Sequence, residues 1–289
     1  MSALHLFRSG AGEQEEVFGG YRLLELVSRG RLSSLYRGED VETGEVVAVK
    51  VLTDYGCQVA RKLQHKLKKD WEGERARKLQ HPNVVRTLTC GRHRGRYYIV
   101  MEYLSGGNLL SLLRSRSPLL EGRKIEIMRQ AAAGLEYVHR CGVIHRDVCP
   151  RNIMLAADGT AKLIDFGVAA NRGDRIRDVG QRTGTPAYMA PELVRTNQFD
   201  ELTDIYAFGV SLYEVATGER PIKFTDDSPQ AIAAAILNAA IRRPREVRPS
   251  ISERLERIIL RAMDQRRHAR YPSMTRLLED LATVSDGDL

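Results

Sequence analysis

The spacing of apolar residues changes near Gly106-Gly107. Before this point, segments such as Glu45–Leu52 are rich in β-branched residues, and turn residues such as Thr43-Gly44 separate them, which predicts strands joined by hairpins. After it, apolar residues recur every three or four positions, for example from Ile125 to Met128, which predicts helices with one apolar face. We therefore expect an α+β chain in which a five-stranded antiparallel part precedes a mainly helical part.

The same patterns give approximate boundaries for each element. The expected strands are Tyr21–Val27, Ser34–Gly38, Glu45–Leu52, Val84–Leu88 and Tyr97–Met101. The first part also holds one expected helix, Arg61–Leu79, which should stop before His81-Pro82. The second part is expected to hold a hairpin of Asn152–Leu155 with Ala161–Ile164, and helices near 125–138, 204–217, 231–240, 252–263 and 274–283.

The 289 residues suit one large domain or two close-packed lobes. We expect a loose tail over residues 1–17, a domain over 18–282 with a lobe boundary near 104/105, and a short polar tail over 283–289. With 43% apolar residues the chain can bury a large core. Its net charge of +8 comes with acidic and basic residues interspersed, so an ordinary solvated surface is favoured over a nucleic-acid surface. The basic run 61–69 is likewise read as a solvated helix face rather than a membrane contact.

Neither the N-terminus nor the cysteines point to export. Residues 1–16 lack the charged and apolar regions of a signal peptide, and no window has the roughly 18 apolar residues of a membrane span. The four cysteines show no Cys-x-x-Cys pair and no zinc-finger spacing. We therefore expect reduced thiols and a cytoplasmic location.

Four short segments occur in a fixed order. They are Ala48-Val49-Lys50 (AVK) on an expected strand, His145–Asn152 (HRDVCPRN), Asp165-Phe166-Gly167 (DFG) and Gly184–Glu192 (GTPAYMAPE). Each alone is a weak signal, but the four together, in order and in suitable strand or loop contexts, are very specific.

On these segments the chain resembles the eukaryotic-type (Hanks-type) serine/threonine protein kinase family, over roughly residues 18–282. The stretches VIHRDVCPRNIML and YMAPELV are similar to the bacterial members. The resemblance implies a two-lobed fold, a signalling role, and transfer of the γ-phosphate of ATP, with Mg²⁺, to serine or threonine hydroxyls of protein substrates. From the interspersed charges we expect no nucleic-acid partner, and we predict no oligomeric state.

The resemblance also assigns the chemistry to particular residues. Lys50 matches the lysine that holds the α- and β-phosphates, with Glu72 as its carboxylate partner and Glu74 as a substitute. Asp147 matches the catalytic base, and Thr185 the threonine that bonds it. Asn152 and Asp165 match the magnesium ligands, hard oxygen donors that suit a hard cation.

The nucleotide itself is expected between the two lobes. Met101, Glu102 and Leu104 resemble the hinge that holds adenine, with Met101 as gatekeeper. Apolar side chains of Ala48, Leu35 and Met154 would sandwich the ring, and these are also core positions. The loop expected to cover the phosphates comprises Val27, Ser28, Arg29, Gly30, Arg31, Leu32, Ser33 and Ser34.

Two departures affect the parts that grip phosphate. The loop keeps only Gly30 of three glycines, and Ser28 adds a side chain where backbone amides approach phosphate. Arg29 and Arg31 either compensate with charge or face solvent at a hairpin tip. Cys149 stands where serine/threonine kinases usually carry a lysine that contacts the γ-phosphate.

Arg151 lies four residues after Asp147, where tyrosine kinases place an arginine. Our hypothesis is that Arg151 makes the γ-phosphate contact that Cys149 cannot make.

A third departure concerns regulation. Between Gly167 and Thr183 there is no serine, threonine or tyrosine. Either Thr183 is the regulatory phosphorylation site, or Asp174 and Asp178 partly replace a phosphate near Arg146. We favour activity that depends little on phosphorylation of this loop.

Other matches imply scaffold roles. Glu192 is expected to pair with Arg270 in a buried ion pair. Asp204 resembles the helix aspartate that holds the backbone of the catalytic loop.

Two alternatives stay open. A pseudokinase is favoured by Ser28 and Cys149 but opposed by the retention of Lys50, Asp147 and the two metal-ligand candidates. A kinase-like small-molecule phosphotransferase is opposed by the segment 184–192, which resembles a platform for an extended peptide.

Overall fold

The computed structural model describes residues 16–66, 70–174, 184–196, 198–224, 226, 228–238 and 240–289. These residues form two compact units. Unit 1 contains the chain up to Val59 together with Leu88–Tyr103, and unit 2 contains Ala60–Thr87 and Leu104–Leu289. The expected lobe boundary near 104/105 lies close to the third crossing between the units, at 103/104, but residues 60–87 group with unit 2 rather than with the first lobe.

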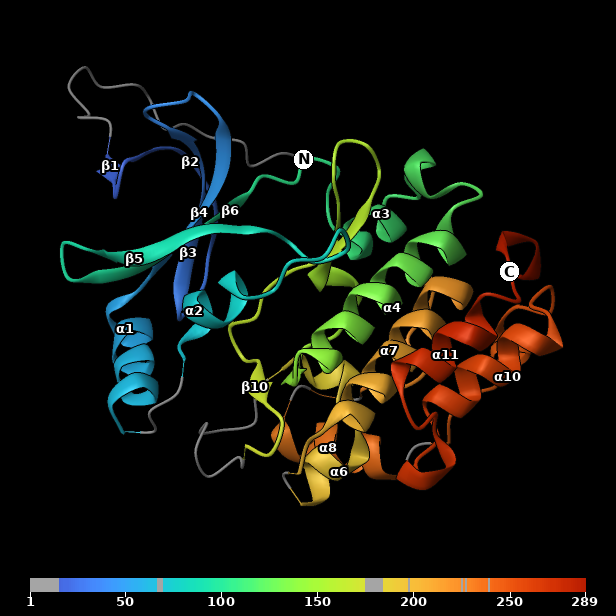
Figure 1. The fold of residues 1–289 in the computed structure, drawn as a ribbon. Coiled ribbons are helices and arrows are strands. Elements are labelled where there is room, and N and C mark those ends of the chain that lie inside the picture. The colour runs from blue at the N-terminus through green and yellow to red at the C-terminus, as the bar shows by residue number, and fades with distance from the viewer. Residues whose placement is uncertain are drawn as a thin grey trace. The chain divides into compact units, whose positions relative to one another are not determined.

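Unit 1 is built on an antiparallel sheet in the order β1-β2-β3-β4-β6-β5 (Figure 1). It has six strands rather than the expected five, because Val17 and Phe18 pair with Arg22 and Tyr21 to form β1. The expected strand Val84–Leu88 was misplaced, since β5 starts at Thr87. The strands are β1 (Val17–Phe18), β2 (Tyr21–Arg29), β3 (Ser33–Asp40), β4 (Val46–Leu52), β5 (Thr87–His93) and β6 (Arg96–Glu102).

Turn chemistry explains the hairpins of this sheet. Gly44 has φ +73°, and Arg94 and Gly95 have φ 47° and 83°. This left-handed backbone is what tight turns between twisted antiparallel strands require. Val47, Val49 and Val51 alternate along β4 and pack with Phe18 and Val100 as a small core.

The expected helix Arg61–Leu79 is not continuous. The described residues form α1 (Asp54–Arg61), a π-helical turn η1 (Lys62–Lys66) and α2 (Glu72–Arg77). The helical segment thus starts seven residues earlier than expected, because Thr53 Oγ1 accepts a hydrogen bond from Gly56 N (3.1 Å) and caps the first turn.

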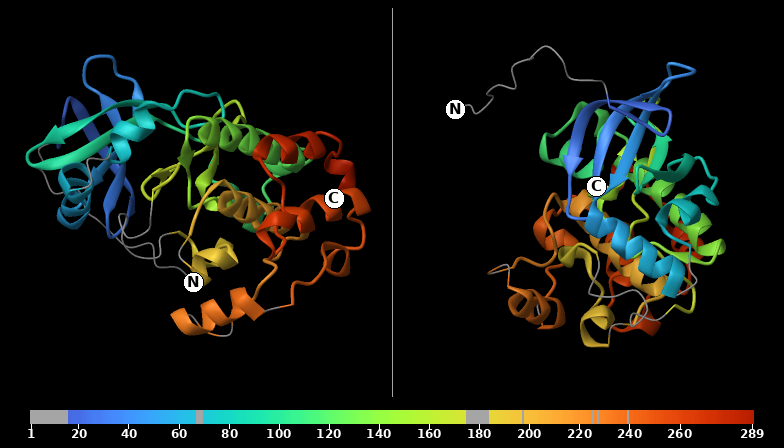
Figure 2. Two further views of the ribbon diagram at one scale, coloured as in Figure 1. Left: turned by 60° about the horizontal axis from the view of Figure 1, so that its bottom comes forward. Right: turned by 90° about the vertical axis from the view of Figure 1, so that its left-hand side faces the viewer.

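Unit 2 is mainly helical, as the sequence predicts. The helix Lys124–Arg140 (α4) packs along the C-terminal helix α11 (Figures 1 and 2). The other helices are α3 (Leu109–Arg114), α6 (Pro191–Arg195), α7 (Glu201–Thr217), α8 (Pro229–Asn238), α9 (Pro244–Val247), α10 (Glu253–Ala262) and α11 (Met274–Leu281). Single 3-10 turns are η2 (Pro118–Leu120), η3 (Pro150–Asn152), η4 (Pro186–Tyr188), η5 (Arg267–Ala269) and η6 (Asp286–Asp288). Short strands pair as β7 (Val143–Ile144) with β10 (Ala170–Asn171) and β8 (Ile153–Leu155) with β9 (Ala161–Leu163).

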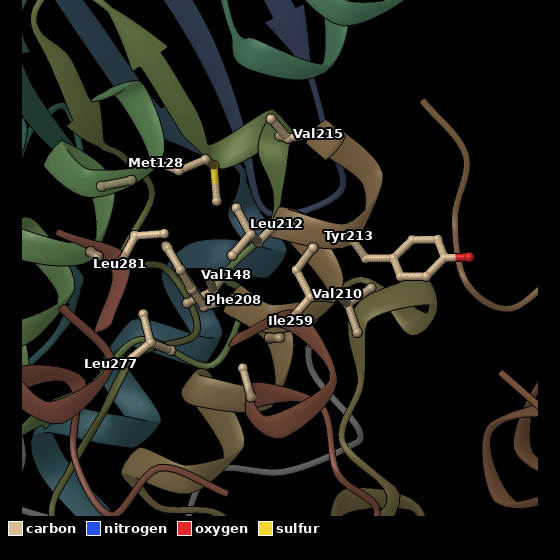
Figure 3. Close-up of a cluster of buried hydrophobic side chains, with 14 of the residues drawn as sticks. Met128, Val148, Phe208, Val210, Leu212, Tyr213, Val215, Ile259, Leu277 and Leu281 are labelled. Atoms are coloured by element: carbon tan, nitrogen blue, oxygen red, sulfur yellow. The ribbon is translucent and has the colours of Figure 1, made fainter. Parts of the chain in front are cut away.

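The core of unit 2 surrounds α7. This helix is buried from Thr203 to Ala216, so it is apolar on nearly all sides, as expected for a helix in the interior of a large domain. Figure 3 shows Phe208, Leu212 and Val215 of α7 among side chains of α4, α10 and α11. Val148 of the loop after β7 belongs to the same cluster, which anchors that loop to the core.

The last residues, expected as a short polar tail, pack on α4. Val284 is buried, and the Asp286 carboxylate accepts hydrogen bonds from the amides of Lys124 and Ile125, each at 2.8 Å. Asp286 thus satisfies two unpaired amides at the N-terminus of α4.

Within the described ranges, no helix combines the length and apolar character needed to cross a membrane.

Candidate active site

One face of the unit 1 sheet carries several of the expected nucleotide residues. Strand register places Leu35 opposite Lys50, Lys50 opposite Ile99, and Ala48 opposite Met101. Residues directly opposite each other in an antiparallel pair share a face. The structure therefore puts Leu35, Ala48, Lys50 and Met101 on the same face, away from the buried valines of β4. Glu102 is the last residue of β6, and Leu104 is buried in unit 2.

The loop expected to cover phosphate is the tip of the β2–β3 hairpin. Arg29 pairs with Ser34, Ser28 pairs with Leu35, and Val27 forms a bulge. The Gly30 amide donates to Ser33 O at 2.8 Å, which closes the tip.

This tip is fixed to the start of α1. Thr53 donates from its amide to Leu32 O (2.9 Å) and from its hydroxyl to Arg31 O (2.8 Å). A Cβ on Gly56 would lie 2.0 Å from Leu32 O, so only glycine permits this approach. Arg31 is exposed at the hairpin tip, one of the two environments expected for it, and its guanidinium also stacks over the ring of Tyr55 at 4.5 Å.

Two glutamates of α2 were candidates for the partner of Lys50. Glu74 accepts hydrogen bonds from Gln64 Nε2 (3.1 Å) and from the amide of Trp71 (3.4 Å), so its carboxylate serves the helix. Glu72 is the first residue of α2 and is half-buried. Glu72 stays the predicted partner of Lys50, as the sequence resemblance implies.

Asp204 fixes the backbone at the start of the catalytic loop. Its buried carboxylate accepts hydrogen bonds from the amides of His145 and Arg146, both at 2.8 Å, as expected. His139 Nε2 lies 2.8 Å from the same carboxylate. Burial opposes ionisation of Asp204, but His139 and these donors hold its pKa below the usual value. The carboxylate stabilises Arg146 in a left-handed conformation with φ 67°.

His145 is held as a single tautomer. Its Nε2 lies 3.0 Å from the carbonyl of Ile164, which can only accept, so Nε2 carries the hydrogen. Its Nδ1 then accepts from the amide of Asp147 at 3.3 Å. The ring therefore ties the base to the residue before Asp165.

The Asp147 carboxylate is oriented by three donors. Oδ1 accepts from the amide and the hydroxyl of Thr185, both at 2.7 Å. Oδ2 accepts from Asn152 Nδ2 at 2.9 Å. A carboxylate oxygen has about two acceptor sites, so Oδ1 is saturated and Oδ2 keeps one site for a further donor.

Asn152 and Asp165 fit the role of hard-cation ligands. Asn152 Nδ2 donates to both the carbonyl (2.8 Å) and the carboxylate of Asp147, which leaves its Oδ1 for a cation. The Asn152 carbonyl accepts from the amide of Ile164 at 2.9 Å, which brings exposed Asp165 next to it in the fold. Among the residues that the structure describes, no group of three or more His, Cys, Asp or Glu side chains is arranged to hold a metal.

Arg151 reaches the base through Thr185. The exposed Arg151 donates from Nη2 to Thr185 Oγ1 at 2.8 Å, and that hydroxyl donates to Asp147. Cys149 is 1% exposed and lies 3.9 Å from the same hydroxyl. Burial, together with the charge of Asp147, raises the pKa of the Cys149 thiol to about 11, so it is neutral at physiological pH.

Two buried arginines lie near Asp174, in the loop that follows Gly167, which we call the activation segment. Arg146 donates to Val168 O (3.1 Å) and stacks over Phe199 at 4.3 Å. Burial lowers its pKa to about 10, and the charges of Asp204 and, more weakly, Asp174 oppose that shift. Arg75 of α2 is 4% exposed, burial lowers its pKa as well, and Asp174 is the strongest opposing charge. Asp178 and Thr183 lie outside the described residues.

The expected ion pair under the substrate segment is present. Arg270 donates from Nη1 and Nη2 to the two oxygens of Glu192, at 2.7 and 2.9 Å. Arg270 is 2% exposed and Glu192 7%. Met154, expected near adenine, is half-buried in unit 2 and forms an isolated bridge with Asn108.

A model of the protein kinase domain matches residues 21–281. The chain belongs to the protein kinase family. It falls in the bacterial serine/threonine branch of the eukaryotic-type kinases, because its relatives are bacterial proteins named serine/threonine-protein kinases. The serine/threonine-protein kinase PknE of Mycobacterium tuberculosis is 35% identical over 265 residues, which are 91% of this chain and 46% of that protein.

Two further relatives agree. PknB of Mycobacterium tuberculosis, also named a serine/threonine-protein kinase, is 33% identical over 275 residues (93% of this chain, 43% of that protein). A probable serine/threonine-protein kinase, SCO3848 of Streptomyces coelicolor, is 33% identical over 282 residues (95% and 41%). The kinase therefore spans less than half the length of the relatives that it matches.

Sequence reasoning missed two buried polar residues of this kinase. His139 supports Asp204, and Arg75 adds a second buried guanidinium beside Arg146. His139 follows Val138 on the apolar side of α4, and a polar residue bordering such a stripe is a signal of a buried partner.

Proposed function

We propose that the kinase transfers the γ-phosphate of ATP to serine or threonine hydroxyls of proteins. The observation that carries the proposal is the Asp147 carboxylate, which three donors orient so that one acceptor site on Oδ2 stays open. An incoming hydroxyl can donate to that site and lose its proton there as it attacks phosphorus.

The other residues serve positioning and charge. Lys50 would hold the α- and β-phosphates, and the loop 27–34 would cover them. Asn152 and Asp165 would hold Mg²⁺, which neutralises charge on the phosphates when bound. Thr185 keeps the base in one orientation, which matters because phosphoryl transfer depends mainly on positioning and electrostatics.

Arg151 is proposed as the cation at the γ-phosphate. It is exposed beside the base, and its guanidinium has five N–H donors, of which one faces Thr185. The neutral thiol of Cys149 supplies no charge for this role.

Activity that needs little loop phosphorylation is also proposed. The Asp174 carboxylate is the strongest charge that stabilises protonated Arg75, and it adds a smaller contribution to that of Asp204 at Arg146; a phosphate would otherwise supply such a charge. Its Oδ2 accepts from the amide of Asn171 at 3.0 Å, so the carboxylate is fixed in place.

A pseudokinase is the second candidate, favoured by Cys149 and Ser28. The oriented base and the available amide oxygen of Asn152 argue against it, because a site that no longer transfers phosphate has no need of either. A cytoplasmic location is proposed from the four cysteines, which are all free thiols.

A phosphotransfer assay tests the proposal. The protein is incubated with labelled ATP, Mg²⁺ and a generic basic protein, beside an Asp147→Asn variant whose melting temperature confirms folding. We expect label in the basic protein well above the variant's level. Label no higher than that of Asp147→Asn would favour the pseudokinase.

A further inference from the structure

Unit 2 carries a groove that the phosphotransfer proposal does not use. It has a volume of about 820 Å³ and lies between the end of α4, the start of α7, the end of α10, η5 and the start of α11. Its charged lining includes Arg140, Arg172, Arg261, Arg267, Glu136 and Glu201. We call it the arginine groove.

Exposed arginines make the groove positive toward a ligand. The side chains of Arg140, Arg172, Arg261 and Arg267 are 75%, 62%, 50% and 33% exposed. Those of the acids Glu136 and Glu201 are only 20% and 23% exposed. In these two pairs the carboxylate is more buried than the guanidinium, whereas Asp280 beside Arg261 is 48% exposed and Asp200 beside Arg267 is 37% exposed. The positive charge of the groove comes from the excess of arginines over acids in its lining.

Two of these arginines offer donors that their own partners do not occupy. Arg140 lies 3.8 Å from Glu136, and Arg261 lies 3.7 Å from Asp280, both beyond hydrogen-bond distance. Arg261 also stacks over the ring of Tyr271 at 4.2 Å, which fixes its plane and leaves its edge available. A pre-positioned guanidinium loses less entropy when it binds an anion.

The chemistry favours a phosphate ester over a carboxylate. Each arginine already has a carboxylate of this chain nearby. A ligand carboxylate would have the same charge and the same acceptor atoms as that group, so it would gain no advantage in binding the arginine. A phosphate monoester carries about two charges and three acceptor oxygens, which match guanidinium edges in pairs. It can therefore accept hydrogen bonds from the unoccupied donors of Arg140 or Arg261 without displacing their acids.

The size of the groove allows a ligand larger than a single ion. Pockets for drug-sized ligands measure roughly 300–1,000 Å³, so this volume exceeds what a lone ion fills. Apolar surface from Leu202 and Pro272 lies beside the arginines, which suits the residues that flank a phosphorylated side chain. We propose that the arginine groove docks a phosphorylated segment of a partner protein.

The groove also adjoins the support of the catalytic loop. Arg172 donates to the carbonyl of His139 at 3.1 Å, and His139 bonds Asp204. His139 is 6% exposed, and its Nδ1 has no hydrogen-bond partner within the described part of the chain. A docked segment that contacts Arg172 would thus be linked through His139 to the Asp204 carboxylate, which holds the catalytic loop.

A binding assay without ATP tests the proposal. The probe is a fluorescein-labelled peptide with one phosphothreonine among alanine and glycine residues, compared with the same peptide carrying threonine or glutamate. The test variant is Arg140→Gln/Arg261→Gln. The matched control is Arg245→Gln/Arg254→Gln, which removes the same charge from exposed arginines of α9 and the start of α10.

We expect the Kd for the phosphothreonine peptide to rise at least about tenfold in the test variant and less than about twofold in the control. Equal weakening in both variants would show general attraction and refute the site. Equally tight binding of the glutamate peptide would refute phosphate selectivity. Displacement by inorganic phosphate at the peptide's own concentration would refute a peptide ligand. None of these outcomes bears on phosphotransfer, which the Asp147→Asn comparison decides.

Discussion

Single residues around the base account for the unusual features of this site. A lysine expected two residues after Asp147 is a buried cysteine, and an exposed arginine contacts Thr185 instead. Cys149 packs against Thr185 and is shielded from solvent. This environment suits a neutral thiol and would not suit the charged amino group of a lysine. Next to the base, position 149 is therefore buried and neutral, and position 151 is exposed and positively charged.

Cys149 should resist alkylation in the folded protein. Both low exposure and a pKa of about 11 keep it from forming a reactive thiolate at pH 8. Exposed Cys141 is the internal control. With iodoacetamide, peptide mapping by mass spectrometry should find Cys141 labelled and Cys149 unlabelled until urea is added. Equal labelling of the two in native protein would contradict the buried environment.

Arg151→Ala should lower kcat about ten- to a hundredfold, because one charge-assisted hydrogen bond contributes roughly 1.5–3 kcal/mol. The KM for ATP should change little, since Lys50 and the loop are untouched. Arg151→Lys should restore part of the rate, because it keeps the charge but loses the planar fork. Steady-state kinetics of both variants measure this, and unchanged turnover in Arg151→Ala would remove Arg151 from the mechanism.

At the scale of elements, the β2–β3 tip and the start of α1 are joined by hydrogen bonds and close packing. Thr53 binds two carbonyls of the tip, and Gly56 allows the close approach. The phosphate loop is thus held by the element that follows β4, and its position depends on a residue outside the glycine motif.

Gly56→Ala should separate these elements. Its Cβ would lie 2.0 Å from Leu32 O, a backbone atom that cannot move alone. We expect a loss of roughly 1–3 kcal/mol of stability and a higher KM for ATP. Gly30→Ala is the control for stability, since its nearest contact would be 3.4 Å. Equal melting temperatures for wild type and Gly56→Ala would show that the tip is not fixed in this way.

The activation segment gives a second test at this scale. If Asp174 already supports Arg75 and Arg146, Thr183→Ala should keep most of the activity, while Asp174→Asn should lose more. Phosphopeptide mapping combined with kinase assays measures both. Stoichiometric phosphate on Thr183 together with inactive Thr183→Ala would overturn the proposal.

Periodicity and turn residues predicted most elements, because they depend on local chemistry. The helices α4, α7, α10 and α11 lie within a few residues of their expected positions. The break between α1 and α2 and the later start of β5 were missed, because composition does not reveal which cap or partner is used. Val84, expected in a strand, instead bridges Leu163, a contact between residues far apart in sequence.

Motif spacing identified Asp147, Asn152 and Thr185, whose mutual hydrogen bonds the structure contains. It gave no sign of His139 or Arg75, because their roles arise only once α4 and α2 pack in unit 2. The contact of Arg31 with Tyr55 was missed for the same reason.

At the scale of the whole molecule, unit 2 depends on charges inside an apolar core. Glu192 and Arg270 are joined by two hydrogen bonds, and Arg270 also donates to the carbonyls of Leu202 (2.9 Å) and Asp264 (2.7 Å). This pair connects α6, α7 and the segment before α11.

Breaking this pair should destabilise the protein. Glu192→Ala leaves a buried guanidinium without its carboxylate, which costs on the order of 3–5 kcal/mol. Arg276→Gln breaks an exposed pair with Glu279 and should cost less than about 1 kcal/mol. Urea unfolding followed by circular dichroism compares them. A Glu192→Ala midpoint equal to that of Arg276→Gln would contradict a structural role for the pair.

Asp204 links the catalytic loop to α7 with consequences for motion. The amides of His145 and Arg146 donate to its carboxylate rather than to a neighbouring strand. Because Asp204 is in a helix buried on nearly all sides, these two amide hydrogens should exchange with solvent only when α7 itself opens. The start of the catalytic loop, whose amides bond Asp204 instead of a neighbouring strand, should therefore keep its conformation for as long as α7 stays folded.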